Sequence, residues 1–278
     1  MTKPGQSLTG AAFAVAAFLI WGLSPLYFRA VAGVPALEIL AHRVLWSLLL
    51  IVVLLALARG WAPVRRACTD RRVLAMLGLS TLLVSVNWFI YIWSIEVGRL
   101  LEASLGYYIN PLVSVLLGVV FLRERLGPLQ WAAAALATLG VVGLALEAET
   151  FPWISLTLAF TFGCYGLVRK IAPLESVQGL FMETLLLAPL SLGYLIYLGV
   201  QGSGSFAAVS PRLDLLLALS ALVTAVPLVC FASAARRLSL STVGFFQYLA
   251  PPCQFLVAVL VFGERLTDTY FQAFLCIW

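Results

Sequence analysis

Apolar stretches of about 20 residues follow one another along almost the whole chain, separated by short polar connections. A helix of about 20 residues spans the roughly 30 Å hydrocarbon core of a lipid bilayer. Apolar residues make up 63% of the 278 residues and charged residues only 10%, whereas soluble domains have about 25% charged residues. The chain is therefore predicted to be an all-α integral membrane protein.

Ten stretches are expected to form transmembrane helices. They cover residues 8–28, 36–58, 73–95, 101–122, 128–146, 151–169, 174–199, 213–235, 241–262 and 268–278. Nine of them are long enough, or nearly so, to cross the membrane. The last one reaches about half of the required length before Trp278. We therefore expect this sequence to stop inside its tenth helix.

Two stretches of the chain repeat the same pattern 140 residues apart. Aligning residues 103–126 with 243–266 places Tyr108 on Tyr248 and Pro111 on Pro251, and superimposes the two Glu-Arg-Leu triplets. The chain is therefore predicted to consist of two five-helix units, 1–147 and 148–278, and the odd helix number makes the second unit inverted. A helix-breaking proline at matched positions of two such units indicates a binding site for a transported solute.

Basic residues are unevenly distributed over the expected connections. With the N-terminus inside, the cytoplasmic positions hold 12 of the 17 basic residues. These are Lys3, Arg59, Arg65, Arg66, Arg71, Arg72, Arg123, Arg125, Arg169, Lys170, Arg236 and Arg237. Cytoplasmic loops are enriched in Lys and Arg, so the N-terminus is predicted to be cytoplasmic. The net charge of +5 thus reflects topology and indicates no nucleic-acid partner.

A polar stripe accompanies each of the matched prolines. Its members in the two units are Tyr107, Asn110, Ser114, and Gln247 with Gln254. The first three share one helical face because they are spaced i, i+3 and i+7. The prolines, Pro111 and Pro251, are expected to break their helices and to free backbone carbonyl groups. The stripes are interpreted as two half-sites facing a central cavity; interhelical hydrogen bonding is the alternative.

Aromatic and amide side chains occur near the middle of two other expected helices. They are Trp21 in the first helix, and Asn87, Trp88 and Tyr91 in the third. Aromatic residues beside glycines are suited to form the walls of a pocket for a flat, partly apolar solute. Close packing of helices through the glycines explains the pattern equally well.

Four ionisable residues lie near or within the expected second and seventh helices: Glu38, His42, Arg43 and Glu183. An unpaired charge in the membrane costs at least about 2.5–3.5 kcal/mol. Glu183 is therefore interpreted as a proton-coupling carboxyl group or as the counter-charge of Arg43, with a structural ion pair as the alternative. His42 is the only histidine, so we expect a hydrogen-bonding role rather than metal ligation.

No metal or cofactor site is indicated by the remaining residues. Five cysteines are scattered without ligand spacing. The Glu-Arg-Leu triplets at 124–126 and 264–266 are expected to be structural, with a role as gate residues in alternating access as the alternative. The carboxylate of Glu124 precedes Gly127 and Pro128, where the N-terminus of the 128–146 helix carries positive partial charge.

Several longer strings resemble the RarD-type permeases of the EamA branch of the drug/metabolite transporter superfamily. They include Glu38-Ile-Leu-Ala-His-Arg43, Glu102-Ala-Ser-Leu-Gly-Tyr-Tyr-Ile-Asn-Pro-Leu112 and Leu240-Ser-Thr-Val-Gly-Phe-Phe-Gln-Tyr248. The resemblance covers nearly the whole chain. It implies a bacterial inner-membrane protein with ten helices in two inverted EamA units and a transporter role. The family continues through a complete tenth helix, where this chain stops.

Three functional hypotheses follow. The first is a secondary carrier that moves a small organic solute by alternating access, by proton coupling or exchange, since the chain has no Gly-rich phosphate loop. The second is a membrane-embedded enzyme acting on lipid, which would need clustered acids, histidines or cysteines. The third is a channel or a sensor. The first hypothesis implies a small-molecule substrate and the lipid bilayer as partners.

Overall fold

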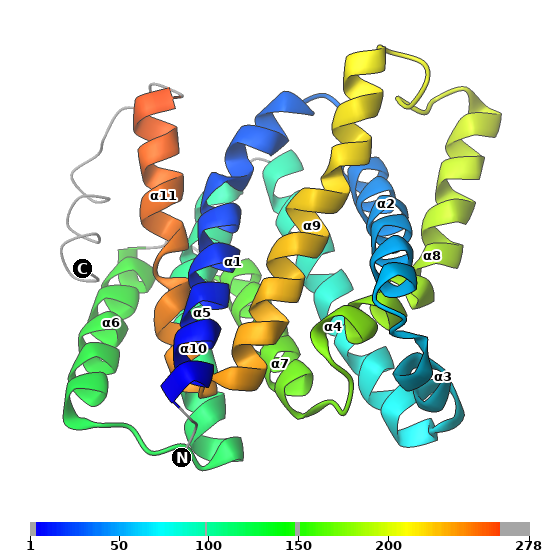
Figure 1. Cartoon of the computed structure of the whole chain (residues 1–278). Coiled ribbons are helices and arrows are strands. Elements are labelled where there is room, and N and C mark those ends of the chain that lie inside the picture. Colours follow the sequence, from blue (N-terminus) through cyan, green and yellow to red (C-terminus); the bar gives the residue numbers. More distant parts are fainter. Residues whose placement is uncertain (1–3, 98, 148–150, 262–278) are drawn as a thin grey trace.

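Helices account for nearly all of the structure (Figure 1). The computed structural model describes residues 4–97, 99–147 and 151–261. Its helices are α1 (Pro4–Ala30), α2 (Ala36–Leu57), α3 (Trp61–Thr69), α4 (Arg71–Glu96), α5 (Leu100–Leu122), α6 (Pro128–Glu147), α7 (Trp153–Ile171), α8 (Ser176–Gln201), α9 (Pro211–Arg237), α10 (Leu240–Gln247) and α11 (Ala250–Leu256). A π-helical turn over Val257–Val261 follows α11.

The first eight expected stretches each coincide with one helix: α1, α2, α4, α5, α6, α7, α8 and α9. In the described part of the chain, seven helices are long and apolar enough to cross a membrane. The apolar part of α6, Pro128–Gly143, is shorter than these seven. The expected tenth helix, 268–278, lies outside the described residues, as does the second Glu-Arg-Leu triplet. The fold is that of a helical bundle that crosses the membrane several times.

The two matched prolines differ in their effect on the helices. The helix break predicted at Pro111 is wrong, because α5 runs through this residue without interruption. Pro111 is buried, and Gly244 of α10 packs against its carbonyl oxygen. Proline is tolerated inside a membrane helix when neighbouring helices cover it. Near Pro251 the helix is interrupted at Tyr248 and Leu249, and Pro251 itself lies in the first turn of α11.

The short helix α3 was not expected from the sequence. It connects α2 to α4 and buries Val64 and Ala67. The Trp61 ring packs edge-on against the Phe181 ring of α8, with 5.3 Å between the ring centroids. The apolar spacing of residues 61, 64 and 67 was a helical signal, but it lies in a polar connection that is too short to span a membrane.

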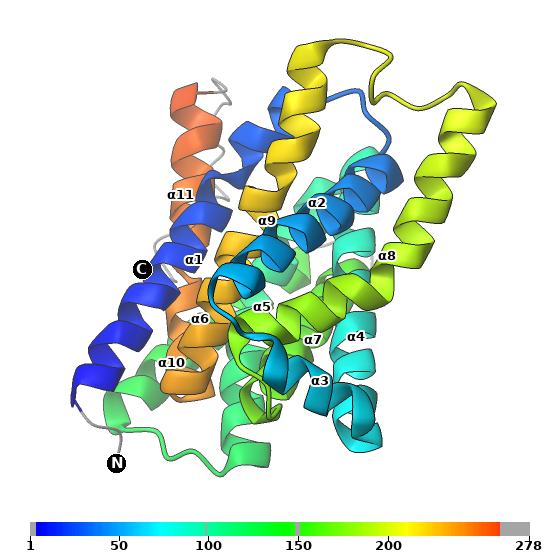
Figure 2. The same ribbon diagram turned by 45° about the vertical axis from the view of Figure 1, so that its right-hand side comes forward.

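The long helices run alternately up and down in the bundle (Figures 1 and 2). The described N-terminal end, α3, and the α5–α6, α7–α8 and α9–α10 connections all lie at the lower end. The α1–α2 and α8–α9 connections lie at the upper end. The segments that carry the cluster of basic residues thus share one end of the molecule.

Helices from the first half of the chain pack chiefly against helices from the second half. The most extensive contacts are those of α5 with α7, α1 with α9, and α2 with α8. Small residues allow close approach: a Cβ atom added at Gly106 of α5 would lie 3.0 Å from the Ser155 carbonyl oxygen of α7. One added at Gly22 of α1 would lie 2.5 Å from Cys253 of α11. The halves therefore form one interlocked bundle.

Polarity is distributed as lipid surroundings require. Large apolar side chains point outward, among them Leu190 at 75% exposure and Leu139 at 70%. Several charged and amide side chains are buried, including Glu38, Arg43, Arg169 and Glu183. Such extended apolar faces are unusual on a soluble monomer. Buried polar groups need partners within the protein, which makes them informative about the site.

Glu124 ties the end of α5 to the start of α10. The left-handed conformation of Arg123 (φ 54°) ends α5 and turns the chain back. The Glu124 carboxylate then accepts hydrogen bonds from Leu240 N (2.6 Å), Ser241 N (2.9 Å) and Ser241 Oγ. The prediction that this carboxylate faces the 128–146 helix is therefore wrong, because the turn directs it to the N-terminal N–H groups of α10 instead.

Replacing Glu124 by alanine is expected to destabilise the protein, because two backbone donors at the start of α10 lose their acceptor. The expected loss is about 1–3 kcal/mol. Thermal unfolding of the purified protein in detergent measures it, with Arg125→Ala at the neighbouring exposed position as the control. Equal melting temperatures for the two variants would contradict this role.

Candidate functional site

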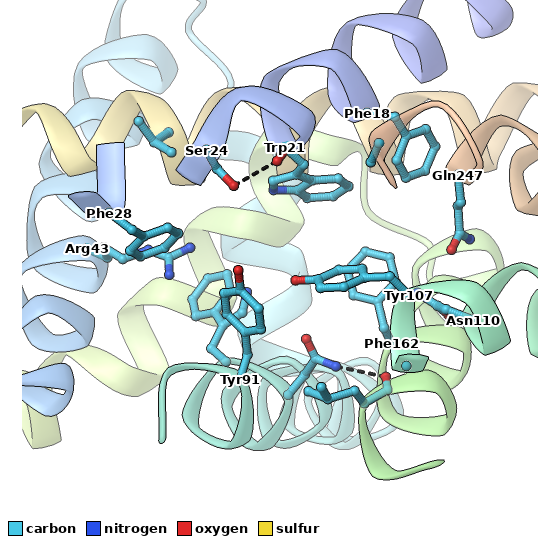
Figure 3. Close-up of a pocket in the computed structure, with 16 residues that line it drawn as sticks. Phe18, Trp21, Ser24, Phe28, Arg43, Tyr91, Tyr107, Asn110, Phe162 and Gln247 are labelled. Atoms are coloured by element: carbon cyan, nitrogen blue, oxygen red, sulfur yellow. Dashed lines mark hydrogen bonds between the residues drawn. The ribbon is translucent and has the colours of Figure 1, made fainter. Parts of the chain in front are cut away.

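A cavity lies where helices from both halves of the chain meet (Figure 3). Its walls come from α1, α2, α4, α5, α7, α9, α10 and α11. The cavity has a volume of about 70 Å³, which is enough for several water molecules. The lining residues are Phe18, Trp21, Ser24, Phe28, Arg43, Asn87, Trp88, Tyr91, Gly106, Tyr107, Asn110, Leu158, Phe162, Val223, Gln247 and Ala250.

Seven of the nine predicted substrate-binding residues lie on the cavity wall. They are Trp21, Asn87, Trp88, Tyr91, Tyr107, Asn110 and Gln247. The other two are not part of the wall. Ser114 accepts a hydrogen bond from Gln247 Nε2 (2.9 Å), and Gln254 Nε2 donates to the Trp21 carbonyl oxygen (3.4 Å). In the structure Ser114 and Gln254 therefore hold wall residues in place.

Two groups of aromatic rings form much of the wall. Tyr91 of α4 packs edge-on against Tyr107 of α5, with 5.6 Å between ring centroids, and Phe28 of α1 lies 6.1 Å from Tyr91. In the other group, Trp21 packs edge-on against Phe162 of α7, with 5.5 Å between the ring centroids. Edge-to-face contacts of this kind fix ring orientations. The cavity thus presents rigid, flat apolar surfaces.

The three amides of the wall have different roles. Asn87 Nδ2 donates to the Leu158 carbonyl oxygen and to Thr161 Oγ1, both at 2.9 Å, so this amide ties α4 to α7. The Gln247 amide donates to Ser114 and ties α10 to α5. The buried Asn110 amide has no hydrogen-bond partner among the described residues, and its Oδ1 atom is fully enclosed. Asn110 is therefore the amide of the wall whose hydrogen-bonding capacity the protein leaves unused.

Arg43 is the charged residue of the wall. It is 5% exposed, and its Nε donates to Thr224 Oγ1 of α9 at 2.8 Å. The guanidinium group lies over the Trp88 ring (4.9 Å to the centroid) and the Phe28 ring (5.5 Å). No carboxylate among the described residues forms an ion pair with it. The site therefore contains a buried cation that aromatic faces and one hydroxyl group stabilise.

Glu183 does not reach the cavity. Its carboxylate pairs with Arg169 Nε at 3.6 Å and accepts hydrogen bonds from Ser80 Oγ (2.6 Å) and the Tyr165 hydroxyl group (3.3 Å). The prediction that Glu183 is the counter-charge of Arg43 is therefore wrong. Helix α4 packs on both α7 and α8, and Arg169 of α7 meets Glu183 of α8 instead. Both partners are buried, with 0% and 1% side-chain exposure.

The other two ionisable residues of α2 lie beside the α8–α9 connection. Glu38 accepts hydrogen bonds from Ser205 N (2.6 Å), Ser205 Oγ (2.9 Å) and Phe206 N (3.3 Å). His42 Nδ1 accepts a hydrogen bond from Trp46 Nε1 at 3.3 Å. No group of three metal-ligating side chains occurs in the described part of the chain. Both residues bind neighbouring protein groups outside the cavity wall.

Sequence reasoning did not select Phe18, Ser24 or Phe28 for the site, although all three line the cavity from α1. They share a face with Trp21 because their spacing of three to four residues matches the helical period. A periodicity search centred on Trp21 would have found this face. Phe162 of α7 also lines the cavity, where it packs edge-on against Trp21.

Fold and site together define the class as a multi-pass membrane protein with an internal cavity between helices of both halves of the chain. Residues 8–146 match the EamA-like transporter family. An uncharacterized transporter of Vibrio cholerae is 46% identical over 97% of this chain and 89% of its own length. Protein RarD of Escherichia coli is 42% identical over 98% and 92%, respectively. The chain belongs to the EamA-like transporter family and is a RarD-type permease, a membrane transporter of the drug/metabolite superfamily.

A more distant relative and a solved structure extend the comparison. The chloramphenicol-sensitive protein RarD of Pseudomonas aeruginosa is 33% identical over 97% of this chain and 91% of its own length. A crystal structure with 21% sequence identity matches with a TM-score of 0.72, covering 98% of this chain and 94% of the other. That likeness shows that the helical arrangement also occurs in a protein with very different side chains.

Replacing Glu183 by glutamine is expected to destabilise the protein, because Arg169 would keep its buried charge without a partner. Breaking a buried pair from one side costs about 3–5 kcal/mol. Thermal unfolding in detergent measures the loss, with Glu175→Gln at an exposed position as the control. Removing both charges, as in Arg169→Met/Glu183→Leu, should recover part of the loss. A single variant as stable as the wild type would refute the role of this pair.

Proposed function

We propose that this transporter is a secondary carrier that moves a small organic solute across the bacterial inner membrane by alternating access. The observation that carries the proposal is the composition of the cavity wall. Helices before residue 148 and helices after residue 150 both contribute to it, the former supplying Asn110 and the latter supplying Gln247. A relative movement of the two halves would therefore change the site that holds the solute.

Two inverted five-helix units, 1–147 and 148–278, are part of the proposal. If α1, α2, α4 and α5 correspond to α7, α8, α9 and α10–α11, related pairs should make similar contacts. The contacts support this: α1 packs on α9 as α7 packs on α4, and α5 packs on α7 as α1 packs on α10 and α11. The helices α2 and α8, and α5 and α10, pack on their own counterparts, as expected near a two-fold axis.

Energy coupling is proposed to occur by exchange or by protons. Glu183 was the predicted proton carrier, but it lies in the buried pair with Arg169 and away from the cavity wall. Its position supports a structural role more directly than a coupling role. The two roles differ in one respect: a coupling carboxyl group controls the pH dependence of transport. A Glu183→Gln variant that transports with an unchanged pH profile would eliminate the coupling role.

The first prediction from this proposal concerns the two half-sites. In the Asn110→Ala/Gln247→Ala variant, transport should fall by tenfold or more, because the polar contact of Asn110 with the solute and the hydrogen bond that holds Gln247 of the wall to Ser114 are both lost. Mass spectrometry of the medium and of cell extracts measures it, comparing wild type, the variant and an empty vector. Thr138→Ala, on α6 and away from the wall, is a matched control.

A solute whose distribution depends on the wild type and on both amides would identify the cargo and the transport direction. Counterflow of that solute in proteoliposomes then separates a carrier from a channel. Equal distributions for wild type and empty vector, at equal membrane abundance of the protein, would count against transport under those conditions. Equal activity of the wild type and the double variant would refute the role of the two amides.

The second prediction concerns orientation. The N-terminus is proposed to be cytoplasmic, which places α3 and its exposed Cys68 in the cytoplasm. A membrane-impermeant maleimide should therefore label Cys68 in inside-out vesicles and leave it unlabelled in intact cells. A Cys68→Ser variant provides the background signal. Labelling of Cys68 in intact cells would reverse the proposed orientation.

A further inference from the structure

Arg43 has fewer partners than any other arginine buried in the described structure. Arg169, which is equally enclosed, has Glu183 and the carbonyl oxygens of Glu175 and Ser176 around it. Arg43 has one hydrogen bond, from Nε to Thr224 Oγ1. Its two terminal nitrogens have no acceptor among the described residues, and they are not enclosed in protein as those of Arg169 are. Its free donors therefore face the cavity.

Burying a guanidinium group with so few partners has a high free-energy cost. A cation at membrane depth costs about 2.5–3.5 kcal/mol or more on insertion scales. The faces of Trp88 and Phe28 offset part of this cost, at about 0.5–2 kcal/mol for each ring. A guanidinium fork also matches the two oxygens of a carboxylate, which neither ring can replace. The missing partner is thus an anion that enters the cavity.

The opposite end of the cavity is lined by amide side chains and would bind a different part of a ligand. Figure 3 shows Arg43 and Phe28 at one end, and Asn110 and Gln247 at the other, with Tyr107 and Trp21 between them. The Asn110 Oδ1 atom is an enclosed acceptor without a donor. Because the wall between the two ends is aromatic, the intervening part of a ligand is expected to be flat and apolar.

We propose that the cargo is an organic anion: a carboxylate bound by Arg43, a flat apolar body between the aromatic walls, and a polar group at the end of the cavity that Asn110 lines. This inference rests on the proposed transport function and specifies the substrate class of the same cavity. It also assigns Arg43 a role in recognition rather than in an internal ion pair. Thr224, Trp88 and Phe28 orient the guanidinium group for this purpose.

Pairs of ligands that differ only in charge test the proposal. The pairs are benzoate and benzamide, 4-hydroxybenzoate and 4-hydroxybenzamide, and indole-3-acetate and indole-3-acetamide. Thermal stabilisation of the purified full chain in detergent gives an apparent Kd for each compound. The wild type should bind the carboxylate of at least one pair about ten- to a hundredfold more tightly than the amide, as expected for charged hydrogen bonds.

Three variants locate the preference. Arg43→Gln should abolish it, and Arg43→Lys should keep part of it, because lysine retains the charge but not the fork. Arg212→Gln, at an exposed position in the first turn of α9, should leave it unchanged. If Arg43→Gln does not fold, Arg43→Lys and the wild-type comparison still decide the question. Equal affinities within all three pairs of ligands for the wild type would overturn the proposal.

Counterflow of the preferred compound in proteoliposomes separates this inference from the proposed function. If carboxylates show saturable flux and Arg43→Lys weakens this flux, the result supports both the anion site and the carrier function. Saturable flux of the amides with no preference for the carboxylates overturns the anion site and leaves the carrier function standing. Carboxylate binding through Arg43 without saturable flux of any bound compound supports the anion site and refutes the carrier function.

Discussion

A charged side chain that is buried among apolar helices has to find its partner inside the protein, because the surrounding lipid offers none. Three buried or half-buried carboxylates meet this requirement in different ways. Glu183 pairs with Arg169, whereas Glu38 and Glu124 bind the backbone N–H groups of segments more than 100 residues away in sequence. The Glu38 and Glu124 contacts join elements that are distant along the chain, whereas Glu183 and Arg169 lie on consecutive helices. The contacts that stabilise buried charges thus also hold helices of the bundle together.

Arg43 is a buried charge without a carboxylate partner among the described residues, and the proposed function depends on this difference. The other buried arginine, Arg169, is surrounded by a carboxylate and carbonyl oxygens, but Arg43 has one hydroxyl group and two aromatic faces. Its position on the wall of the cavity gives its charge access to whatever enters. In the proposed anion site this incomplete set of partners leaves Arg43 donors for a solute, whereas Arg169 is enclosed in protein.

The arrangement of the helices makes the cavity a shared product of the whole chain. Helices α1, α2, α4 and α5 contact α7, α8, α9 and α10 more than they contact one another. The cavity is therefore lined by both halves, and close contacts at Gly106 and Gly22 determine how near the helices lie. Glu124 links α5 to α10 at one end of the bundle, and Glu38 links α2 to the α8–α9 connection at the other.

The sequence alone determined the class, most helix positions and much of the cavity wall. Apolar length and helical spacing are local properties, so eight expected stretches coincide with helices, and Tyr107 and Asn110 fall on one face. Partners were decided only by the tertiary structure. Glu183 binds Arg169 rather than Arg43, Glu124 reaches α10, and Ser114 turns to Gln247. The continuity of α5 through Pro111 likewise depends on neighbouring helices. Spacing along one helix places a side chain on a face, but the packing of helices decides what that face meets.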